Sequence, residues 1–350
     1  MRLSSCKRGY SQSTVLGLRI IANALPDSDP YGQAGPSENY NQHMISNPLD
    51  GIRILDGGLA SELEAIGANI TGMLWSAQVL EDEPEKLTAV YKAYIDAGAE
   101  CLATCSYQVS RMGYAEVGKT PAQADAALLR SVAIARAAVR EAPEKHVLVA
   151  GSLGPYGAAL HNGGEYTGEY TCTHDELVRF HRERIEIFAR AQGDEAPDLL
   201  AFETFPSLDE ALAVGEALAP WPELRAWFSF SCRDERHVGH GEPVAEVARA
   251  VAAFPQTVGI GVNCVPARWL PSLIAELKQG SAKPVMVYPN SGEGWDAANR
   301  CWSGQTDPLD FGRQAEEWFR LGASIVGGCC RIGPQHIRAV ARVARALDRP

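Results

Sequence analysis

The sequence predicts an α/β fold, specifically a single-domain (β/α)8 barrel of the TIM type. From residue 52 onward, short apolar or β-branched runs alternate eight times with longer segments of helical periodicity. Glycines, polar residues and cysteines follow the apolar runs, as at the carboxyl ends of barrel strands. A doubly wound open sheet is the second choice, but no Gly-x-Gly-x-x-Gly turn follows the first run.

The eight predicted strands are residues 52–56, 101–106, 147–152, 199–204, 226–231, 258–263, 285–289 and 324–328. The helices that follow them are residues 84–97, 121–141, 175–191, 208–218, 244–253, 270–278, 309–321 and 335–347. Helix starts carry capping signals, because Thr173 or His174 precedes two acidic residues, Ser207 precedes two more, and Pro334 suits a first turn.

Residues 1–48 are expected to be an N-terminal extension that is disordered or not native, and residues 49–350 to be the barrel domain. The first 25 residues are basic and serine-containing with no acid, a composition that resembles a transit peptide. An ordinary extension, or an upstream start codon with Met44 as the working start, is preferred.

The composition excludes some partners. The net charge is -11, whereas nucleic acids and anionic membranes select basic surfaces. No uncharged apolar stretch approaches the roughly 18 residues that cross a bilayer. Nine cysteines without framework spacing fit a reducing compartment, so we expect a cytoplasmic protein, either a monomer or a weak homo-oligomer.

Three cysteines predict a metal site. Cys264 closes the sixth strand, and Cys329 and Cys330 close the eighth, with only the seventh strand between them. Catalytic zinc usually has three protein ligands and an open fourth position, and thiolates are among its preferred donors. A substrate thiol could fill that position as a thiolate, because the ion lowers its pKa. The alternative is that these cysteines are small core residues.

With these residues placed, the sequence resembles the homocysteine S-methyltransferase family. The resemblance covers about residues 50–347 and is most specific where Asn-Cys264 combines with Gly-Gly-Cys-Cys330. The matching stretches are Ile54-Leu-Asp-Gly-Gly-Leu59, Leu74-Trp-Ser76, Gly154-Pro-Tyr-Gly157, Phe202-Glu-Thr-Phe-Pro-Ser207, Trp227-Phe-Ser-Phe230, Gly261-Val-Asn-Cys264, Val287-Tyr-Pro-Asn-Ser-Gly-Glu293 and Gly327-Gly-Cys-Cys-Arg331. The run ending at Glu293 is closer to the branch that uses S-methylmethionine or S-adenosylmethionine than to betaine-using enzymes.

The resemblance implies a zinc-dependent methyltransferase with a homocysteine-binding barrel domain. Cys264, Cys329 and Cys330 would hold Zn²⁺, and homocysteine would supply the fourth ligand through sulfur. A methyl group would pass from a sulfonium donor to that sulfur in one in-line displacement, giving methionine. S-methylmethionine is the preferred donor and S-adenosylmethionine the second.

Other candidate site residues lie at or near strand ends. Asp56 and Glu203 suit the α-ammonium of an amino acid, with a turn residue and a structural ion pair as alternatives. Asn263 is expected to orient a thiolate or the substrate. Trp75 and Tyr107 are candidates for cation–π contact with the sulfonium, and almost equally for plain core aromatics.

Two other functions stay open. The enzyme could methylate another small thiol or selenol, or the protein could be a non-catalytic zinc- or redox-sensing barrel. The carboxylates Asp56 and Glu203 favour an enzyme, because a sensor does not need them.

Two further features are predicted to lie outside the metal site. Residues 163–168 are expected to form a mobile loop, with a lid over the donor as a second interpretation. His181 is expected on a helix surface or at a helix cap.

Overall fold

A computed structural model of the protein describes residues 47–70, 72, 74, 76–292, 294–296, 301–303 and 307–347. The chain divides into two units, Met1–Ile45 and Ser46–Pro350, and all described residues belong to the second. The predicted extension therefore lies outside the described residues, except for its last two positions. Among the helices that are described, none is long and apolar enough to cross a lipid bilayer.

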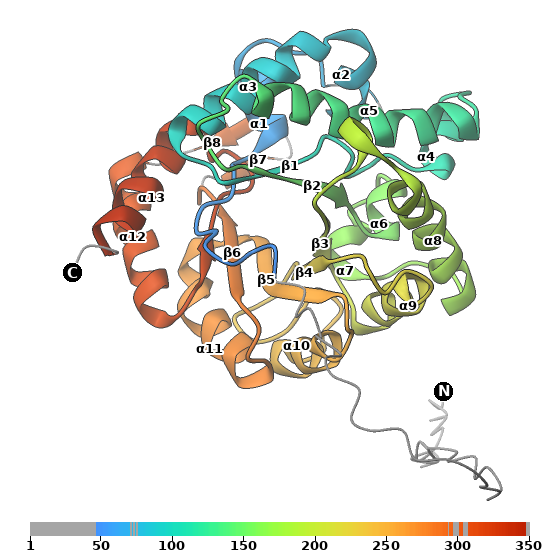
Figure 1. The fold of residues 1–350 in the computed structure, drawn as a ribbon. Helices are drawn as coiled ribbons and strands as arrows, with labels where there is room; N and C mark the ends of the chain where they lie inside the picture. Colours follow the sequence, from blue (N-terminus) through green and yellow to red (C-terminus); the bar gives the residue numbers. More distant parts are fainter. Residues whose placement is uncertain are drawn as a thin grey trace, which may run out of the picture. The chain divides into compact units, whose positions relative to one another are not determined.

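The centre of the fold is a curled, all-parallel sheet of seven strands in the order β1-β2-β3-β4-β5-β6-β9 (Figure 1). Its strands are β1 (Cys101–Ala103), β2 (Leu148–Leu153), β3 (Leu199–Phe205), β4 (Ala226–Phe230), β5 (Thr257–Pro266), β6 (Val285–Asn290) and β9 (Ile325–Val326). Each strand pairs with the next one in this order, and helices cover the outside of the sheet. The predicted α/β class is therefore confirmed, and the second to eighth predicted strands pair in chain order.

The first predicted strand, residues 52–56, is not a regular strand in the structure. Only two isolated parallel bridges form there, Ile54 with Val326 and Leu55 with Cys101. The Glu100 carboxylate accepts hydrogen bonds from the backbone N–H groups of Arg53 and Ile54, at 2.7 and 3.2 Å. Because a side chain takes these two donors, they are not used in a strand ladder.

Eight long helices lie within two residues of their predicted bounds. They are α3 (Pro84–Ala97), α5 (Pro121–Arg140), α8 (His174–Arg190), α9 (Leu208–Leu218), α10 (Val244–Ala252), α11 (Leu270–Gly280), α12 (Pro308–Leu321) and α13 (Pro334–Leu347). Thr173 caps α8 in a reciprocal capping box with Glu176, and the Ser207 side chain caps α9. Local capping chemistry therefore explains the accuracy of these starts.

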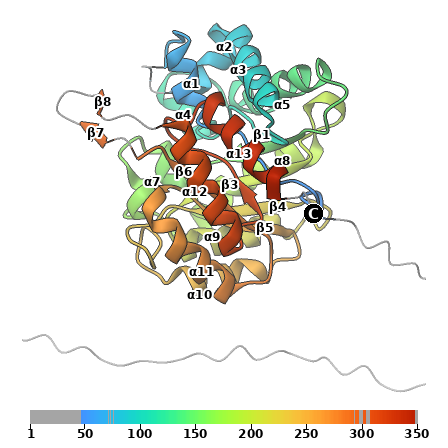
Figure 2. The same cartoon turned by 90° about the vertical axis from the view of Figure 1, so that its left-hand side faces the viewer.

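Several short elements were not predicted, because they are too short to show a periodicity. They are α1 (Leu59–Ala65), α2 (Ser76–Asp82), α4 (Arg111–Glu116), α6 (Tyr156–Ala159), α7 (Gly164–Thr167), the 3-10 turns Gly193–Glu195 and Ala267–Trp269, and the antiparallel hairpin of β7 (Gly294–Asp296) and β8 (Cys301–Ser303). Figure 2 shows the hairpin projecting away from the helices. The loops that follow β1, β2 and β6 thus carry structure of their own.

Two apolar clusters support the site. The larger one joins the helices to the outer face of the sheet. The smaller one contains residues from successive strands, among them Leu148, Leu199, Trp227, Met286 and Tyr288, and includes residues at alternate positions such as Ala150 and Ala201. Alternate strand positions point to the same face, so this second cluster fills the inner face of the curled sheet.

Candidate metal centre and substrate site

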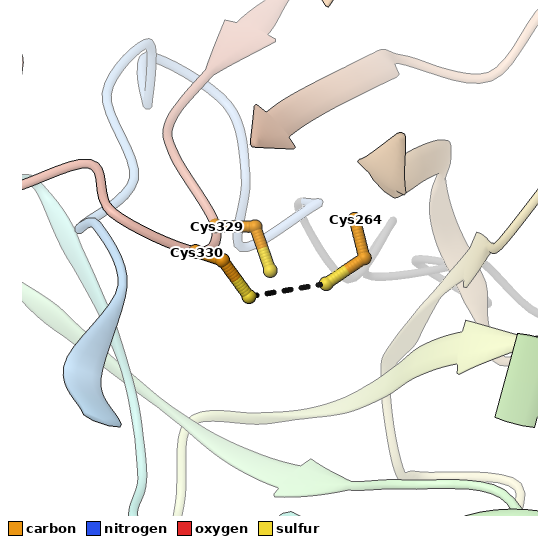
Figure 3. A group of neighbouring side chains, drawn as sticks. All are labelled: Cys264, Cys329 and Cys330. Atoms are coloured by element: carbon orange, nitrogen blue, oxygen red, sulfur yellow. Dashed lines mark hydrogen bonds between the residues drawn. The ribbon is translucent and has the colours of Figure 1, made fainter. Parts of the chain in front are cut away.

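The three predicted metal ligands lie together. Cys264 comes from β5, and Cys329 and Cys330 come from the segment after β9. Their sulfur atoms all lie within 4.8 Å of one another, and the sulfurs of Cys264 and Cys330 are 4.0 Å apart (Figure 3). Zinc–sulfur bonds of about 2.3 Å in a tetrahedral site place two sulfurs about 3.8 Å apart. This set of donors therefore fits one soft divalent ion.

Close backbone packing places the two adjacent cysteines. A Cβ atom at Gly58 would lie 2.3 Å from the Cys329 carbonyl oxygen, so only glycine allows the segment after Leu55 to approach. The Cys329 N–H donates to the Pro289 carbonyl at 2.8 Å, and the Cys330 N–H donates to the Asn290 side-chain oxygen at 3.2 Å. The ends of β6 and β9 thereby hold the pair toward Cys264.

The backbone is strained at the site. In the described part of the chain, four residues other than glycine have positive φ: His161, Thr204, Cys264 and Arg331. Cys264 is itself a candidate site residue. Thr204 directly follows Glu203, and Arg331 directly follows Cys330. Non-glycine residues in this region cost about 1–3 kcal/mol each and occur preferentially at functional sites. The concentration of strain therefore supports a functional role for these strand ends.

The pKa values of the clustered thiols shift in opposite directions. Hydrogen bonds from Cys264 and Cys329 lower the pKa of Cys330 well below its ordinary value. The hydrogen bonds with Cys264 and Cys330, together with burial, raise the pKa of Cys329. The cluster therefore favours ionisation of Cys330 over that of Cys329. A soft cation would replace the remaining protons, because thiolates are the form that binds metals.

Glu203 lies in β3 and is buried, with 8% of its surface exposed. The Ser152 hydroxyl donates to one carboxylate oxygen at 2.5 Å, and Tyr288 also hydrogen-bonds to the carboxylate. Burial raises the pKa of Glu203 despite these two hydrogen bonds. Its negative charge is consequently only partly compensated by the protein.

Asp56 is a second buried carboxylate, with 6% of its surface exposed. It accepts one hydrogen bond from the Ala103 N–H at 2.9 Å. Burial raises the pKa of Asp56 well above its ordinary value, and the nearby charge of Glu203 raises it further. A cation bound between Asp56 and Glu203 would favour the ionised form of both carboxyl groups, because opposite charges lower carboxyl pKa values.

The side chain of Asn263 contacts other protein groups. Its oxygen accepts hydrogen bonds from the Thr204 N–H at 2.9 Å and the Ser229 hydroxyl at 2.8 Å. Its amide nitrogen donates to the Thr204 hydroxyl at 2.7 Å. These contacts hold the positive-φ residue that follows Glu203.

Of the two candidate aromatic residues, Tyr107 lies within the described part of the chain. Tyr107 is half-buried and hydrogen-bonds to Thr204. Burial raises the pKa of Tyr107, and the charges of Glu165, Cys264 and Cys329 raise it further, so its hydroxyl lies close to the sulfur cluster. Trp75 lies outside the described residues, and its contact with the donor stays a prediction.

No site role is predicted from the sequence for Ser152, Tyr288 or Tyr166, although Ser152 lies at the end of a predicted strand. Ser152 and Tyr288 bind the Glu203 carboxylate, and both are polar residues inside strands that are otherwise apolar. That pattern was an available signal, since a buried strand selects apolar side chains. Tyr166 lies in α7, and the sulfur cluster raises its pKa. It belongs to residues 163–168, predicted as a mobile loop or a lid over the donor, where the structure forms the short helix α7.

Known proteins resemble this chain over most of its length. The family model described as homocysteine S-methyltransferase matches residues 53–344. Homocysteine S-methyltransferase YbgG from Bacillus subtilis (strain 168) is 41% identical over 318 residues, which are 88% of this chain and 99% of that protein. Homocysteine S-methyltransferase from Escherichia coli (strain K12) is 40% identical over 310 residues, 87% and 98% of the two chains.

A solved structure agrees with these sequence matches. The metallated form of the homocysteine methyltransferase MmuM from Escherichia coli superposes with a TM-score of 0.74 and 39% identity. The match covers 85% of this chain and 99% of that one. Fold and sequence therefore indicate the same relatives, and one of these relatives has been solved with a metal.

Proposed function

The chain belongs to the homocysteine S-methyltransferase family, and from this premise we propose that it transfers a methyl group from a sulfonium donor to homocysteine, giving methionine. S-methylmethionine is the proposed first donor and S-adenosylmethionine the second. The observation that carries the proposal is the group of three sulfur atoms within 4.8 Å at the carboxyl ends of β5 and β9. We further propose that the bridges at Ile54 and Leu55 complete a closed (β/α)8 barrel around this site.

Cys264, Cys329 and Cys330 would hold the metal, and zinc is the proposed ion because three thiolates suit it. When bound, zinc would lower the pKa of the homocysteine thiol and orient its sulfur. Asp56 and Glu203 would bind the α-ammonium of homocysteine, because both are buried and neither contacts a cationic side chain in the described part of the chain.

The remaining candidates would have supporting roles. Asn263 is proposed as a positioning residue, because its amide holds Thr204 and thereby the direction of Glu203. Tyr107 would contact the donor, since its hydroxyl lies near both Cys264 and Cys329. We propose a cytoplasmic protein that is a monomer or a weak homo-oligomer, with residues 1–48 as an extension outside the barrel domain.

The experiment that tests this function measures methionine formed from homocysteine with S-methylmethionine, S-adenosylmethionine or betaine. Each assay is run on the purified protein, after chelation, and after zinc is returned. We expect turnover with the two sulfonium donors, loss on chelation and recovery with zinc. Turnover with betaine alone would contradict the proposed donor class.

A second measurement tests the site independently of turnover. The Cys330→Ser variant should lose most of its zinc, measured by elemental mass spectrometry, and its activity. Glu203→Ala should keep the metal and bind homocysteine more weakly. Full zinc occupancy in Cys330→Ser would overturn the proposed ligands. Turnover only with another thiol or a selenol would indicate the alternative acceptor, and no turnover at all would favour the zinc- or redox-sensing alternative.

A further inference from the structure

The segment after β2 is pinned beside the sulfur cluster. The Glu165 carbonyl oxygen, in α7, accepts a hydrogen bond from the Ser231 hydroxyl at 2.7 Å. A Cβ atom at Gly157 would lie 2.5 Å from the Glu165 nitrogen, and one at Gly239 would lie 2.5 Å from the Tyr166 carbonyl oxygen. Three different parts of the chain therefore hold the backbone of these two residues.

This backbone directs the Tyr166 side chain to the metal site. The Tyr166 hydroxyl lies near the three thiols, because Cys264, Cys330 and Cys329 raise the pKa of Tyr166. The residue nevertheless keeps 45% of its surface exposed. Tyr166 thus lies beside the sulfur cluster and is also in contact with solvent.

Glu165 carries an unsatisfied buried oxygen. Its Oε2 atom is buried and has no hydrogen-bond partner among the described residues. Burial raises the pKa of Glu165, and its charge acts on Tyr107 more strongly than those of Cys264 or Cys329 do. A buried carboxylate oxygen without a partner is unfavourable and calls for a ligand or a functional explanation.

We propose that Glu165, with the aromatic rings of Tyr107 and Tyr166, binds the positive charge of the sulfonium methyl donor. This inference rests on the proposed function, in which Asp56 and Glu203 already bind the ammonium of the acceptor. The donor brings a second cation to the same cluster, and Glu165 offers a carboxylate oxygen without a partner in the part of the chain that the structure describes. Aromatic faces suit a sulfonium, since cation–π contacts grow stronger when the cation is desolvated.

The chemistry defines how the effect should divide between KM and kcat. As the methyl group moves, the carbon–sulfur bond of the donor breaks and its electron pair stays on the donor sulfur, which becomes a neutral thioether. The carboxylate of Glu165 therefore interacts with the charged donor more strongly than with the product. Removing it should weaken donor binding, and kcat should not fall, because the interaction already weakens as the transition state forms.

The test compares Glu165→Gln with the matched control Glu169→Gln, an exposed carboxylate in the same segment. We expect the KM for S-methylmethionine to rise about tenfold or more in Glu165→Gln, as for loss of one charge-assisted contact. The KM for homocysteine and the zinc content should stay within about twofold of wild type, and kcat should not fall. Glu165→Asp, which keeps the charge, should be affected less than Glu165→Gln.

Calorimetric titration with S-methylmethionine alone separates this inference from the proposed function, because it needs no turnover. We expect about tenfold weaker binding to Glu165→Gln than to wild type or Glu169→Gln, with equal thermal unfolding of all three. Equal donor KM and equal binding in Glu165→Gln and wild type would overturn the role of Glu165. Absence of methionine formation by wild type would instead overturn the proposed function.

Discussion

Two buried carboxylates, Glu210 and Glu203, have opposite environments. Glu210, on the helical flank in α9, accepts hydrogen bonds from the Tyr156 N–H at 2.5 Å, from His181 at 2.9 Å and from the Tyr170 hydroxyl. Among the described residues, the Glu203 carboxylate at the strand end is contacted only by hydroxyl groups, those of Ser152 and Tyr288. The flank thus satisfies its own charge, whereas the strand end retains a charge that a substrate cation can satisfy.

On the flank, a buried hydrogen-bond network links Arg184 to Glu210 through His181. Arg184 is buried and donates to His181 Nδ1 and to the Gly154 carbonyl oxygen, both at 2.9 Å. A neutral His181 can therefore accept from Arg184 at Nδ1 and donate from Nε2 to Glu210. This network joins α8 and α9 to the segment after β2. Removing a member of this network should therefore lower the free energy of unfolding, whereas removing the Glu203 carboxylate should lower enzymatic activity.

The largest expected effect is on activity in Glu203→Gln. Losing the charge should lower kcat/KM for homocysteine about 100-fold, corresponding to about 3 kcal/mol for a buried hydrogen bond to an ammonium. Stability should not fall, because burial raises the pKa of Glu203 and a neutral amide removes that cost at neutral pH. Steady-state kinetics and thermal melts measure both quantities, and a clear loss of stability with full activity would invert the comparison.

Glu210→Gln should show the reverse pattern. We expect the free energy of unfolding to fall by about 3 kcal/mol, because Arg184 loses its buried counter-charge. The kcat/KM of the folded fraction at low temperature should change less than about threefold. Chemical denaturation measures the free energy of unfolding, and assays at a chosen temperature of 10–15 °C measure kcat/KM. Exposed Glu216→Gln in the same helix is the control.

The acid sensitivity of folding should depend on His181. Burial lowers the pKa of His181 to about 4, below the ordinary value of about 6.5. Between these pH values the unfolded chain binds more protons, so the unfolding free energy should decrease as the pH falls. His181→Gln can keep a donor and an acceptor but does not titrate, and its pH dependence should be shallower. Parallel curves for the two proteins would show that His181 does not contribute.

The smallest expected effect concerns Ser152→Ala. The Ser152 hydroxyl lowers the pKa of Glu203, so its loss should raise that pKa further. The acid limb of the kcat/KM profile for homocysteine should then shift to higher pH, and the value at neutral pH should fall about threefold, as for one hydrogen bond. Ser152→Thr, which keeps the hydroxyl, is the comparison variant. An unshifted profile in Ser152→Ala would show that Ser152 does not control the pKa of Glu203.

Sequence reasoning succeeded where one local pattern is sufficient. Capping residues such as Thr173 and Ser207 placed helix starts, because their side chains bond to backbone groups only three residues away. The meeting of Cys264 with Cys329 and Cys330 was predictable for a related reason. Parallel strands that end at one edge of a sheet bring their last residues together, so strand order alone placed these sulfurs.

Residue type and strand position by themselves determined the barrel-like order, the sulfur cluster and the buried carboxylates Asp56 and Glu203. Tertiary structure decided that His181 lies buried between Glu210 and Arg184, contrary to its predicted surface or capping role. It likewise decided that Asn263 contacts Thr204. Such contacts join residues whose separation along the chain leaves no local pattern, and only packing in three dimensions determines which donor meets which acceptor.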